Sequence, residues 1–396
     1  MNRNRITAGL FLAFALAAPH AQAADPIRIG VPTSLTGPYV ALGEEVKRGV
    51  NFAVNEVNAA GGIAGRKVEA VFADTEGNPD VGRRAAEKLV LGGSKLLIGT
   101  ISSAVGLAVG AQVERWDALY ISSVNKSNRL TTDACNPRMF RANHSDAMDM
   151  AVVGPWLKGR KEKEWVIIAA DYAWGRDSAD EFAAAAAAAG KTVKGKFFAP
   201  LGTKDYAPYI QQIKDLKPDG MWVAIAGRDA VNFGVQAGQF GLLKSVFTVG
   251  QSFAVPSTIS GIGEAANGVW GIVNYTATID TPGNKAFVAD WMKANNGKEP
   301  ANFEAETYVA MKLLFAAIAK AGSSEPGAVA KALETASVDI PFYGNVAMRA
   351  EDHQLRLPNF MGRVAKVNGE LKLVVEQTVD AATATPAPSK DCKMRR

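Results

Sequence analysis

Residues that could do covalent or metal chemistry are scarce in this chain. Its 396 residues include 3 His and 2 Cys, too few for the usual zinc, iron–sulfur or Cys/His catalytic sites. No GxxxxGK(S/T) motif is present, and no GxGxxG motif follows the first predicted strand, so the common phosphate-binding loops are missing. The net charge of +5 is small for a protein that binds nucleic acid. The sequence therefore predicts no cofactor, no metal site and no nucleic-acid partner.

One candidate nucleophile remains. Gly250–Ala254 reads GQSFA, which is similar to the nucleophile elbow of a serine hydrolase with Ser252 as the nucleophile. Its base could only be His144 or His353, and His353 lies in a polar stretch that we expect to be exposed. We predict that the chain is not an enzyme and keep a secreted hydrolase as a minor alternative.

Polar and aromatic residues follow four predicted strands, in the segments Ser34–Tyr39, Thr100–Ala104, Ser122–Lys126 and Asp171–Gly175. In open α/β sheets, ligands bind outside the carboxyl ends of the strands. Small hydroxyl residues at the start of a helix leave backbone N–H groups free to hold a carboxylate. Helix capping explains each loop equally well when it is taken alone. Together, the four loops suggest two lobes that face a shared cleft.

The elements that carry these loops alternate between short β-type runs and helical patterns. One series covers Ile27–Ser122 and a second covers Trp165–Val249. Repeated β-α-β units predict parallel sheets with helices on both faces, so two series predict two doubly wound α/β lobes. After residue 249 the pattern changes to helices, and Gly344–Glu376 reads as short extended pieces.

The N-terminal segment has the pattern of a secretory signal peptide. Arg3 and Arg5 precede the apolar run Ala8–Ala18, and Ala21–Ala23 gives an A-x-A cleavage pattern. The run is shorter than the ~20 residues needed to span a bilayer. We therefore predict that residues 1–24 are a cleaved signal peptide and that the mature protein is soluble and periplasmic.

Export also decides the expected state of the two cysteines. Cys135 and Cys392 would lie in an oxidising compartment, and two cysteines allow only one intramolecular pairing. We predict a Cys135–Cys392 disulfide that ties the C-terminal tail, residues 381–396, to the body of the protein.

Several motifs, in order along the chain, together resemble one known family. They are Ser34–Tyr39 (SLTGPY), Asn55–Asn58 (NEVN), Gly61–Arg66 (GGIAGR), Tyr172–Gly175 (YAWG) and Thr203–Tyr206 (TKDY). The chain resembles the branched-chain amino-acid-type, or leucine/isoleucine/valine-binding-protein-like, periplasmic solute-binding proteins of ABC transporters. The resemblance implies a monomer that captures an amino acid or related small carboxylate by closing two lobes and delivers it to a membrane permease.

The fold implied by this resemblance is the type I periplasmic-binding fold, two α/β lobes joined by three hinge segments around a ligand cleft. Lobe 1 would comprise residues 25–143 and 274–342, and lobe 2 residues 144–273 and 343–380. The hinge segments would lie near Ala142–His144, Ile272–Tyr275 and Pro341–Gly344.

The resemblance also implies a set of ligand-binding residues. The loops after two first-lobe strands would hold the ligand carboxylate through Ser102, Ser103, Ala104, Val124 and Lys126. Tyr39, or Leu42 near it, would contact the ligand from the first-strand loop. The second lobe would contribute Tyr172, Trp174, Ala226 and Gln251.

Two of these positions depart from the amino-acid binders. Ala226 stands where they have an aromatic residue, and Gln251 stands where they have the carboxylate that pairs with the ligand ammonium. A neutral amide cannot neutralise a buried ammonium, and an unpaired buried charge costs several kcal/mol. Two alternatives follow for the ligand: an amino acid whose ammonium pairs with Asp171 or Asp229, or an amine-free, even aromatic, carboxylic acid held by Lys126 or Arg228. A sensor-type binding protein is the alternative role.

Overall fold

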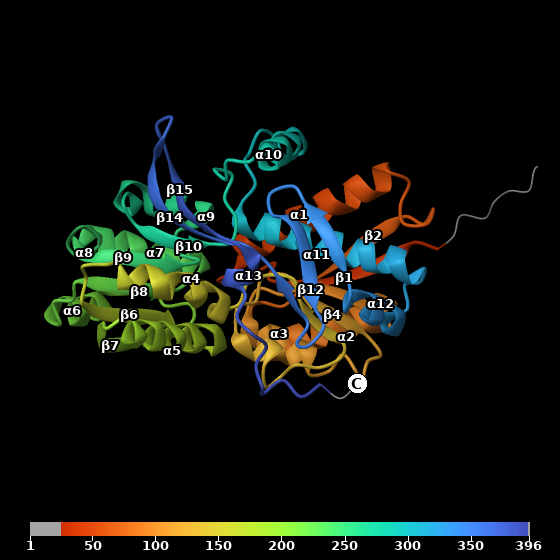
Figure 1. Cartoon of the computed structure of the whole chain (residues 1–396), viewed down its shortest axis with the longest axis horizontal. Helices are drawn as coiled ribbons and strands as arrows, with labels where there is room; N and C mark the ends of the chain where they lie inside the picture. Colours follow the sequence, from red (N-terminus) through yellow and green to blue (C-terminus); the bar gives the residue numbers. More distant parts are fainter. Residues whose placement is uncertain (1–24, 395–396) are drawn as a thin grey trace, which may run out of the picture.

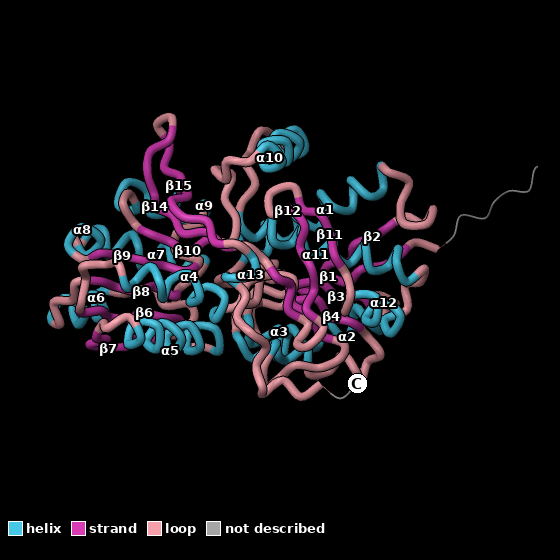
Figure 2. Tube along the Cα trace, viewed as in Figure 1, coloured by secondary structure: helices cyan, strands magenta, loops and turns pink. Residues whose placement is uncertain are grey.

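The computed structural model describes residues 25–394, so the predicted signal peptide lies outside the described residues. Two lobes, each built on one sheet covered by helices, lie side by side (Figures 1 and 2). Within residues 25–394, no helix is both long and apolar enough to cross a bilayer.

The sheet of lobe 1 has the strand order β11-β12-β13-β5-β4-β3-β1-β2. Its first five strands in sequence pair in parallel, whereas β11, β12 and β13 pair with one another in antiparallel fashion at one edge. The strands are β1 (Ile27–Thr33), β2 (Val68–Asp74), β3 (Leu96–Gly99), β4 (Leu119–Ser122), β5 (Met139–Arg141), β11 (Ser337–Ile340), β12 (Gly344–Arg349) and β13 (Gln354–Arg356).

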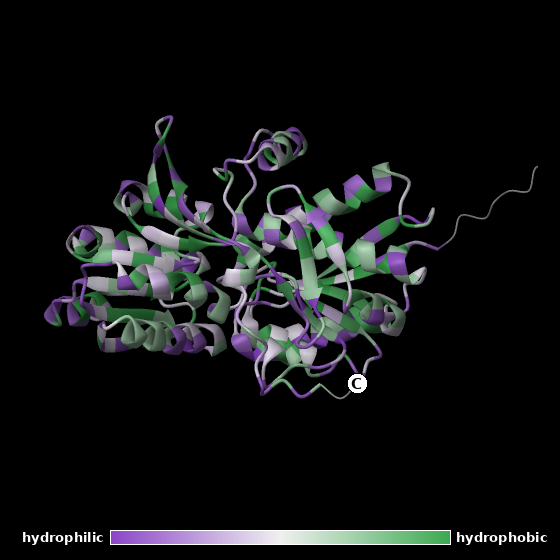
Figure 3. Cartoon of the chain, in the orientation of Figure 1, coloured by the Kyte–Doolittle hydropathy of each residue, from purple (hydrophilic) through white to green (hydrophobic). Residues whose placement is uncertain are grey.

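The sheet of lobe 2 has the order β15-β14-β10-β9-β8-β6-β7, and β14 pairs in antiparallel fashion with both β10 and β15. Its strands are β6 (Glu164–Ala170), β7 (Thr192–Ala199), β8 (Gly220–Ala224), β9 (Phe247–Gln251), β10 (Trp270–Val273), β14 (Asn359–Val367) and β15 (Glu370–Val379). Every residue of β8 is buried, as expected for a parallel strand covered by helices on both faces. In Figure 3, green marks hydrophobic residues and runs along the strands inside both lobes.

Each lobe also has its own set of helices. Lobe 1 carries α1 (Val40–Ala59), α2 (Pro79–Leu91), α3 (Ser103–Gly110), α10 (Pro282–Ala294), α11 (Asn302–Ala321) and α12 (Pro326–Leu333). Lobe 2 carries α4 (Asp146–Lys158), α5 (Ala173–Ala188), α6 (Ala207–Asp215), α7 (Gly227–Gln239), α8 (Leu242–Ser245) and α9 (Pro256–Ile262). The buried residues of α1 include Leu42, Val46, Val50 and Ala53, a helical spacing that faces one stripe toward the core. The alternation of strands and helices thus confirms the predicted α/β fold class.

Before the C-terminal tail, the chain crosses between the lobes at three segments, which we call crossing segments: residues 142–145, 274–275 and 357–358. The third differs from the prediction near residues 341–344, because β12 and β13 were expected in lobe 2. Instead they extend the sheet of lobe 1, where Gln354 pairs with Arg141 of β5. The pairing partner of a short extended piece is not encoded in its local pattern, which is why the sequence placed residues 343–356 in the wrong lobe.

The C-terminal tail returns from β15 of lobe 2 to lobe 1. The predicted disulfide between Cys135 and Cys392 is present, with Cα atoms 5.6 Å apart. The tail is not entirely irregular, because Asp380 caps a short helix, α13 (Ala381–Ala384).

His353 corrects a second expectation. It is buried rather than exposed, and its ring stacks on Phe140 with ring centroids 3.8 Å apart. Its Nδ1 lies 3.0 Å from the carbonyl oxygen of Met139. The polar sequence around it gave no sign of this burial, because β13 packs against β5 from a distant part of the chain.

Candidate ligand-binding site

A cavity lies between the lobes, at the carboxyl ends of the strands. Its lining combines eight residues that the sequence predicted, namely Tyr39, Leu42, Ser103, Val124, Lys126, Tyr172, Trp174 and Ala226, with Ile101, Ser252 and Phe303. The predicted residues Ser102, Ala104 and Gln251 are not part of this lining. The cavity volume is about 20 Å³, room for about one water molecule, so the lobes are held close together.

A buried hydrogen-bond network fixes two loops of lobe 1 against each other. The hydroxyl of Tyr120 lies 2.8 Å from the Gly99 carbonyl oxygen and 2.6 Å from Oδ1 of Asn125. The Nδ2 of Asn125 donates to the carbonyl of Ile101 over 2.9 Å. Burial raises the pKa of Tyr120 to about 12, so its hydroxyl remains protonated. The loops that carry Ser103 and Lys126 are therefore positioned before any ligand arrives.

Ser103 begins α3 at the edge of the cavity. Its Oγ accepts a hydrogen bond from the backbone N–H of Ser127 over 3.2 Å, which leaves its own hydroxyl hydrogen to donate elsewhere. The side chain of Ser102, the N-cap residue, makes no capping hydrogen bond within the described chain. The first N–H groups of a helix have no partner inside the helix and carry partial positive charge, so this end of α3 suits a carboxylate.

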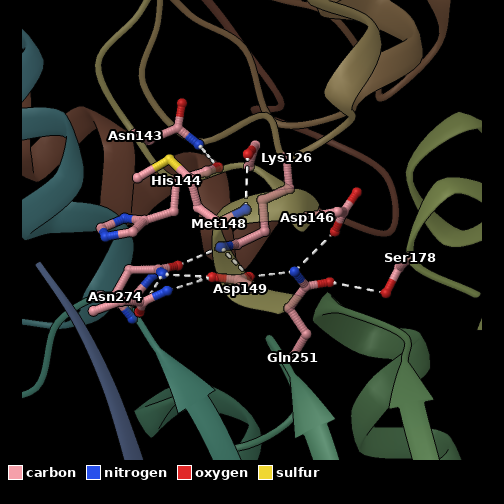
Figure 4. A network of polar contacts seen from close by, with 12 residues as sticks. Lys126, Asn143, His144, Asp146, Met148, Asp149, Ser178, Gln251 and Asn274 are labelled. Carbon is pink, nitrogen blue, oxygen red and sulfur yellow. Dashed lines mark hydrogen bonds and ion pairs between the residues drawn. The ribbon is translucent and has the colours of Figure 1, made fainter. Parts of the chain in front are cut away.

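Lys126 forms a buried ion pair behind the cavity (Figure 4). Its Nζ lies 3.0 Å from Oδ2 of Asp149 and also donates to Oδ1 of Asn274. Oδ1 of Asp149 accepts from Asn274 over 3.1 Å and from Asn359 over 2.8 Å. Asn274 lies in the second crossing segment, Asn359 directly follows the third, and Asp149 lies in the helix that follows the first. One ion pair thus ties all three crossings together.

The pKa values of two neighbouring carboxyl groups in α4 are shifted in opposite directions. Burial favours the neutral form of Asp149, but the positive charge of Lys126, together with neighbouring hydrogen-bond donors such as Gln251 and Asn359, outweighs it and holds the pKa of Asp149 below its usual value. Burial, together with the negative charge of Asp149, raises the pKa of Asp146 well above its usual range. The protonated form of Asp146 is therefore favoured, and the charge of Asp149 is balanced by Lys126.

Both the oxygen and the nitrogen of the Gln251 side-chain amide form hydrogen bonds in this network. Its Oε1 accepts from Trp174 Nε1 over 2.9 Å and from Ser178 over 3.1 Å. Its Nε2 donates to Asp146 over 2.8 Å and also to Asp149. Gln251 therefore holds the indole of Trp174 at the cavity wall instead of lining the cavity itself.

The other predicted charged partners also lie away from the cavity lining. Asp171 pairs with Arg176 over 2.5 Å. Asp229 is buried and accepts from the backbone N–H of Gly202 over 2.7 Å, and burial raises its pKa. The backbone N–H of Arg228 donates to Pro38 of lobe 1 over 3.2 Å. Among the described residues that line the cavity, Lys126 is the one charged side chain.

Aromatic rings from both lobes form the opposite face of the cavity. The rings of Tyr39 and Tyr172 lie 6.3 Å apart, and Tyr172 lies 6.0 Å from Trp174. Close contact at this point needs Gly227, which has φ +63°, because a Cβ there would lie 2.8 Å from the Pro38 carbonyl oxygen.

Ser252 lines the cavity but is not arranged as a nucleophile. His144 is hydrogen-bonded to the Pro358 carbonyl over 2.8 Å, and His353 lies in the sheet of lobe 1 as described above. Neither histidine is a hydrogen-bond partner of Ser252 in the described chain. Residues 25–394 also contain no group of three or more side chains that could hold a metal ion.

Sequence reasoning missed the residues behind the cavity, Asp146, Asp149, Asn274 and Asn359. Asp146 and Asp149 carried a weak signal, since they follow the predicted first hinge directly and open a largely apolar helix. Asn274 carried a similar signal, because it lies in the predicted second hinge, whereas Asn359 carried none.

Comparisons with known proteins agree with this geometry. A family model described as periplasmic binding protein matches residues 26–370. The Leu/Ile/Val-binding protein homolog 3 of Brucella melitensis biotype 1 is 31% identical over 334 residues, which cover 81% of this chain and 87% of that protein. BraC3, a Leu/Ile/Val-binding protein of Rhizobium johnstonii, is 32% identical over 84% of this chain and 89% of its own length.

A solved structure shares the fold. The solute-binding protein of an ABC transporter from Rhodopseudomonas palustris BisB5, in complex with 3,4-dihydroxybenzoic acid, matches with a TM-score of 0.84 and 24% identity. The match covers 90% of this chain and 98% of that one. These relatives are solute-binding proteins rather than enzymes. The chain belongs to the periplasmic binding protein family, alongside the Leu/Ile/Val-binding proteins of ABC transporters.

Proposed function

We propose that this protein captures a small carboxylic acid without an ammonium group and delivers it to a membrane permease. The observation that carries the proposal is the charge of the cavity lining, where Lys126 supplies a cation and none of the described lining residues has a carboxylate that could receive an ammonium. The protein would act in the periplasm as a monomer, with the lobes opening to admit the ligand and closing over it.

The ligand carboxylate would lie at the start of α3. An ammonium group has three N–H donors, and Lys126 uses two of them on Asp149 and Asn274. The third would donate to the ligand, together with the hydroxyl of Ser103 and the first N–H groups of α3. Once the lobes have opened to admit it, the apolar body would pack between Tyr39, Tyr172, Trp174 and Phe303, and the small side chain of Ala226 favours a ring there. The aromatic acid bound by the Rhodopseudomonas palustris protein supports this ligand class.

An amino acid is the second candidate, favoured by one observation. Oδ2 of Asp146 is buried without a hydrogen-bond partner in the described chain. An ammonium placed next to it would lower the pKa of Asp146 and convert it to the missing anion. The names of the Leu/Ile/Val-binding relatives support this candidate.

Matched pairs of ligands distinguish the two candidates. Thermal unfolding would be measured with L-leucine against 4-methylpentanoate and with L-phenylalanine against 3-phenylpropanoate, adding benzoate and 4-hydroxybenzoate. We expect the amine-free member of a pair to stabilise the protein, by ~2.7 kcal/mol at 100 times its dissociation constant. Stabilisation by the amino acids alone would overturn the amine-free assignment and point to Asp146 as the ammonium partner.

Transport and sensing need a separate test. Ligand-loaded protein added to its permease and ATPase in proteoliposomes should stimulate ATP hydrolysis and ligand uptake. If the loaded protein leaves both unchanged, the sensor-type role is the better explanation.

A further inference from the structure

Glu45 is a carboxyl group buried where the two lobes meet. Its side chain is 4% exposed, and its Oε2 has no hydrogen-bond partner within the described chain. Leu42, one turn earlier in α1, lines the ligand cavity, as does Phe303 at the start of α11. Lobe 1 covers Glu45 with α1 and α11, while Ser257 of α9 faces it from lobe 2.

The groups around Glu45 favour its neutral form on balance. Arg48, on the same helix, favours the ionised form, but it forms its ion pair with Glu304 of α11. The Ser257 hydroxyl of α9 and the backbone of Phe303 also favour the ionised form without outweighing burial. Burial, reinforced by the negative charge of Glu304, raises the pKa of Glu45 to about 8. In this closed arrangement Glu45 therefore carries a proton at neutral pH.

Two further carboxyl groups are half-buried at the interface between the lobes. Asp177 of α5 accepts a hydrogen bond from Ser127 of lobe 1, and Glu181 accepts one from Asn128 over 2.7 Å. Burial raises the pKa of both groups. Burial thus raises the pKa of acidic groups on both sides of the interface.

We propose that closure of the lobes is coupled to the uptake of protons by carboxyl groups at their interface, with Glu45 as the principal one. This inference rests on the lobe closure of the proposed function. When α9 moves away, water reaches Glu45 and its pKa returns toward an ordinary 4.5. A group whose pKa is raised in the closed state favours that state fully below its open-state pKa, and the advantage is lost as pH rises toward the closed-state value. Between about pH 5 and pH 8, closure should weaken by up to about tenfold per pH unit.

A ligand-free experiment tests the coupling directly. Fluorophores on cysteines introduced at Leu91 in lobe 1 and Phe240 in lobe 2, both exposed, would report the distance between the lobes from pH 5 to pH 8.5. We expect the closed fraction to rise as pH falls, and Glu45→Gln to keep the closed fraction near its low-pH value throughout. Glu44→Gln is the matched control, because Glu44 is the neighbouring, solvent-accessible carboxylate of α1. It should behave like the wild type. An identical pH dependence in the wild type and Glu45→Gln would overturn the assignment.

A second measurement uses benzoate as the probe. Calorimetry at pH 6.5 in phosphate and in imidazole, which differ in ionisation enthalpy, gives the number of protons taken up on binding. We expect close to one proton in the wild type and a clear loss in Glu45→Gln. Benzoate binding without proton uptake in the wild type would overturn the coupling. If benzoate does not bind, the proposed ligand class is at fault, and the ligand-free distance measurement still decides the coupling.

Discussion

Lys126 and Ser103, the polar wall of the cavity, come from loops that buried hydrogen bonds hold from behind. Tyr39, Tyr172 and Trp174, the aromatic wall, instead meet across the gap between the lobes. Lys126 is tied beside the crossing segments to Asp149, in the first helix of lobe 2, and Asn125 binds the loops of lobe 1 to each other. Tyr39 and Tyr172 contact each other from different lobes, away from these ties. The polar wall thus serves the folded structure as well as the ligand, while the aromatic wall is assembled by closure. Substitutions in the two walls should therefore differ in their effects on the stability of the protein and on its affinity for the ligand.

The largest effect is expected for Lys126→Met. This change keeps the apolar stem but leaves Asp149 as an unpaired charge that is fully buried. Breaking a buried ion pair from one side costs ~3–5 kcal/mol. Urea unfolding should show this loss of stability without any ligand present.

The double variant Lys126→Met/Asp149→Asn is its control. Asparagine keeps the shape of Asp149 without its charge, so most of the lost stability should return while carboxylate binding stays weak. If the double variant is as unstable as the single one, the ion pair is not what holds the crossing segments.

Trp174→Ala tests the aromatic wall. The indole is buried against the cavity and packs near Tyr172, so its removal should weaken ligand binding by roughly 100-fold, the value of about 2–3 kcal/mol of buried aromatic contact. Calorimetric titration gives the dissociation constant, and circular dichroism confirms that the variant is folded. Trp174→Phe should recover much of the affinity, since a ring remains. Unchanged affinity in Trp174→Ala would remove this residue from the site.

A smaller loss is expected for Ser103→Ala. A hydrogen bond to a charged group contributes about 1.5 kcal/mol or more, so affinity for the carboxylate should fall about tenfold with little change in stability. Ser102→Ala is the matched control one residue earlier, outside the cavity lining, and should bind like the wild type. Equal losses in both variants would mean that α3, rather than the Ser103 hydroxyl, is being perturbed.

The smallest effect is expected for the stability of the protein at acid pH. The pKa of Asp149 is lowered in the folded protein, so its contribution to stability is present above its unfolded value of ~3.9 and is lost as pH falls through the folded value. Wild-type stability should therefore decline below about pH 4, and Lys126→Met/Asp149→Asn should decline less steeply. Parallel curves would show that other carboxylates dominate the acid transition.

The sequence predicted much of this fold because its signals are local. The helical sequence pattern of residues 41–60 corresponds to α1, and the alanine run of residues 183–189 lies almost entirely within α5, as alanine's high helix propensity indicates. The helical pattern of Val105–Trp116 extends past the end of α3 at Gly110. The strands β12 and β13 were misplaced because β13 joins the sheet of lobe 1 through β5, which is more than 200 residues away in sequence.

The residues of the candidate site show the same difference between local and long-range sequence signals. Residues of single strand-to-helix loops, such as Ser103 and Trp174, could be predicted because one motif carries each of them. The partners of Lys126 could not, since Asp149, Asn274 and Asn359 come from three separate parts of the chain. Gln251 was predicted to touch the ligand for the same reason: its position in the motif is visible, but the acids that occupy its amide are not.

The bond between Cys135 and Cys392 closes a covalent ring, because 257 positions of sequence separate the two cysteines. Every strand and major helix of lobe 2 lies inside that ring. Tension applied to the chain outside the ring passes through the sulfur–sulfur bond and bypasses the enclosed backbone. Lobe 2 is thereby shielded from mechanical extension, and a protease that cuts one of its loops leaves two fragments that remain a single covalent molecule.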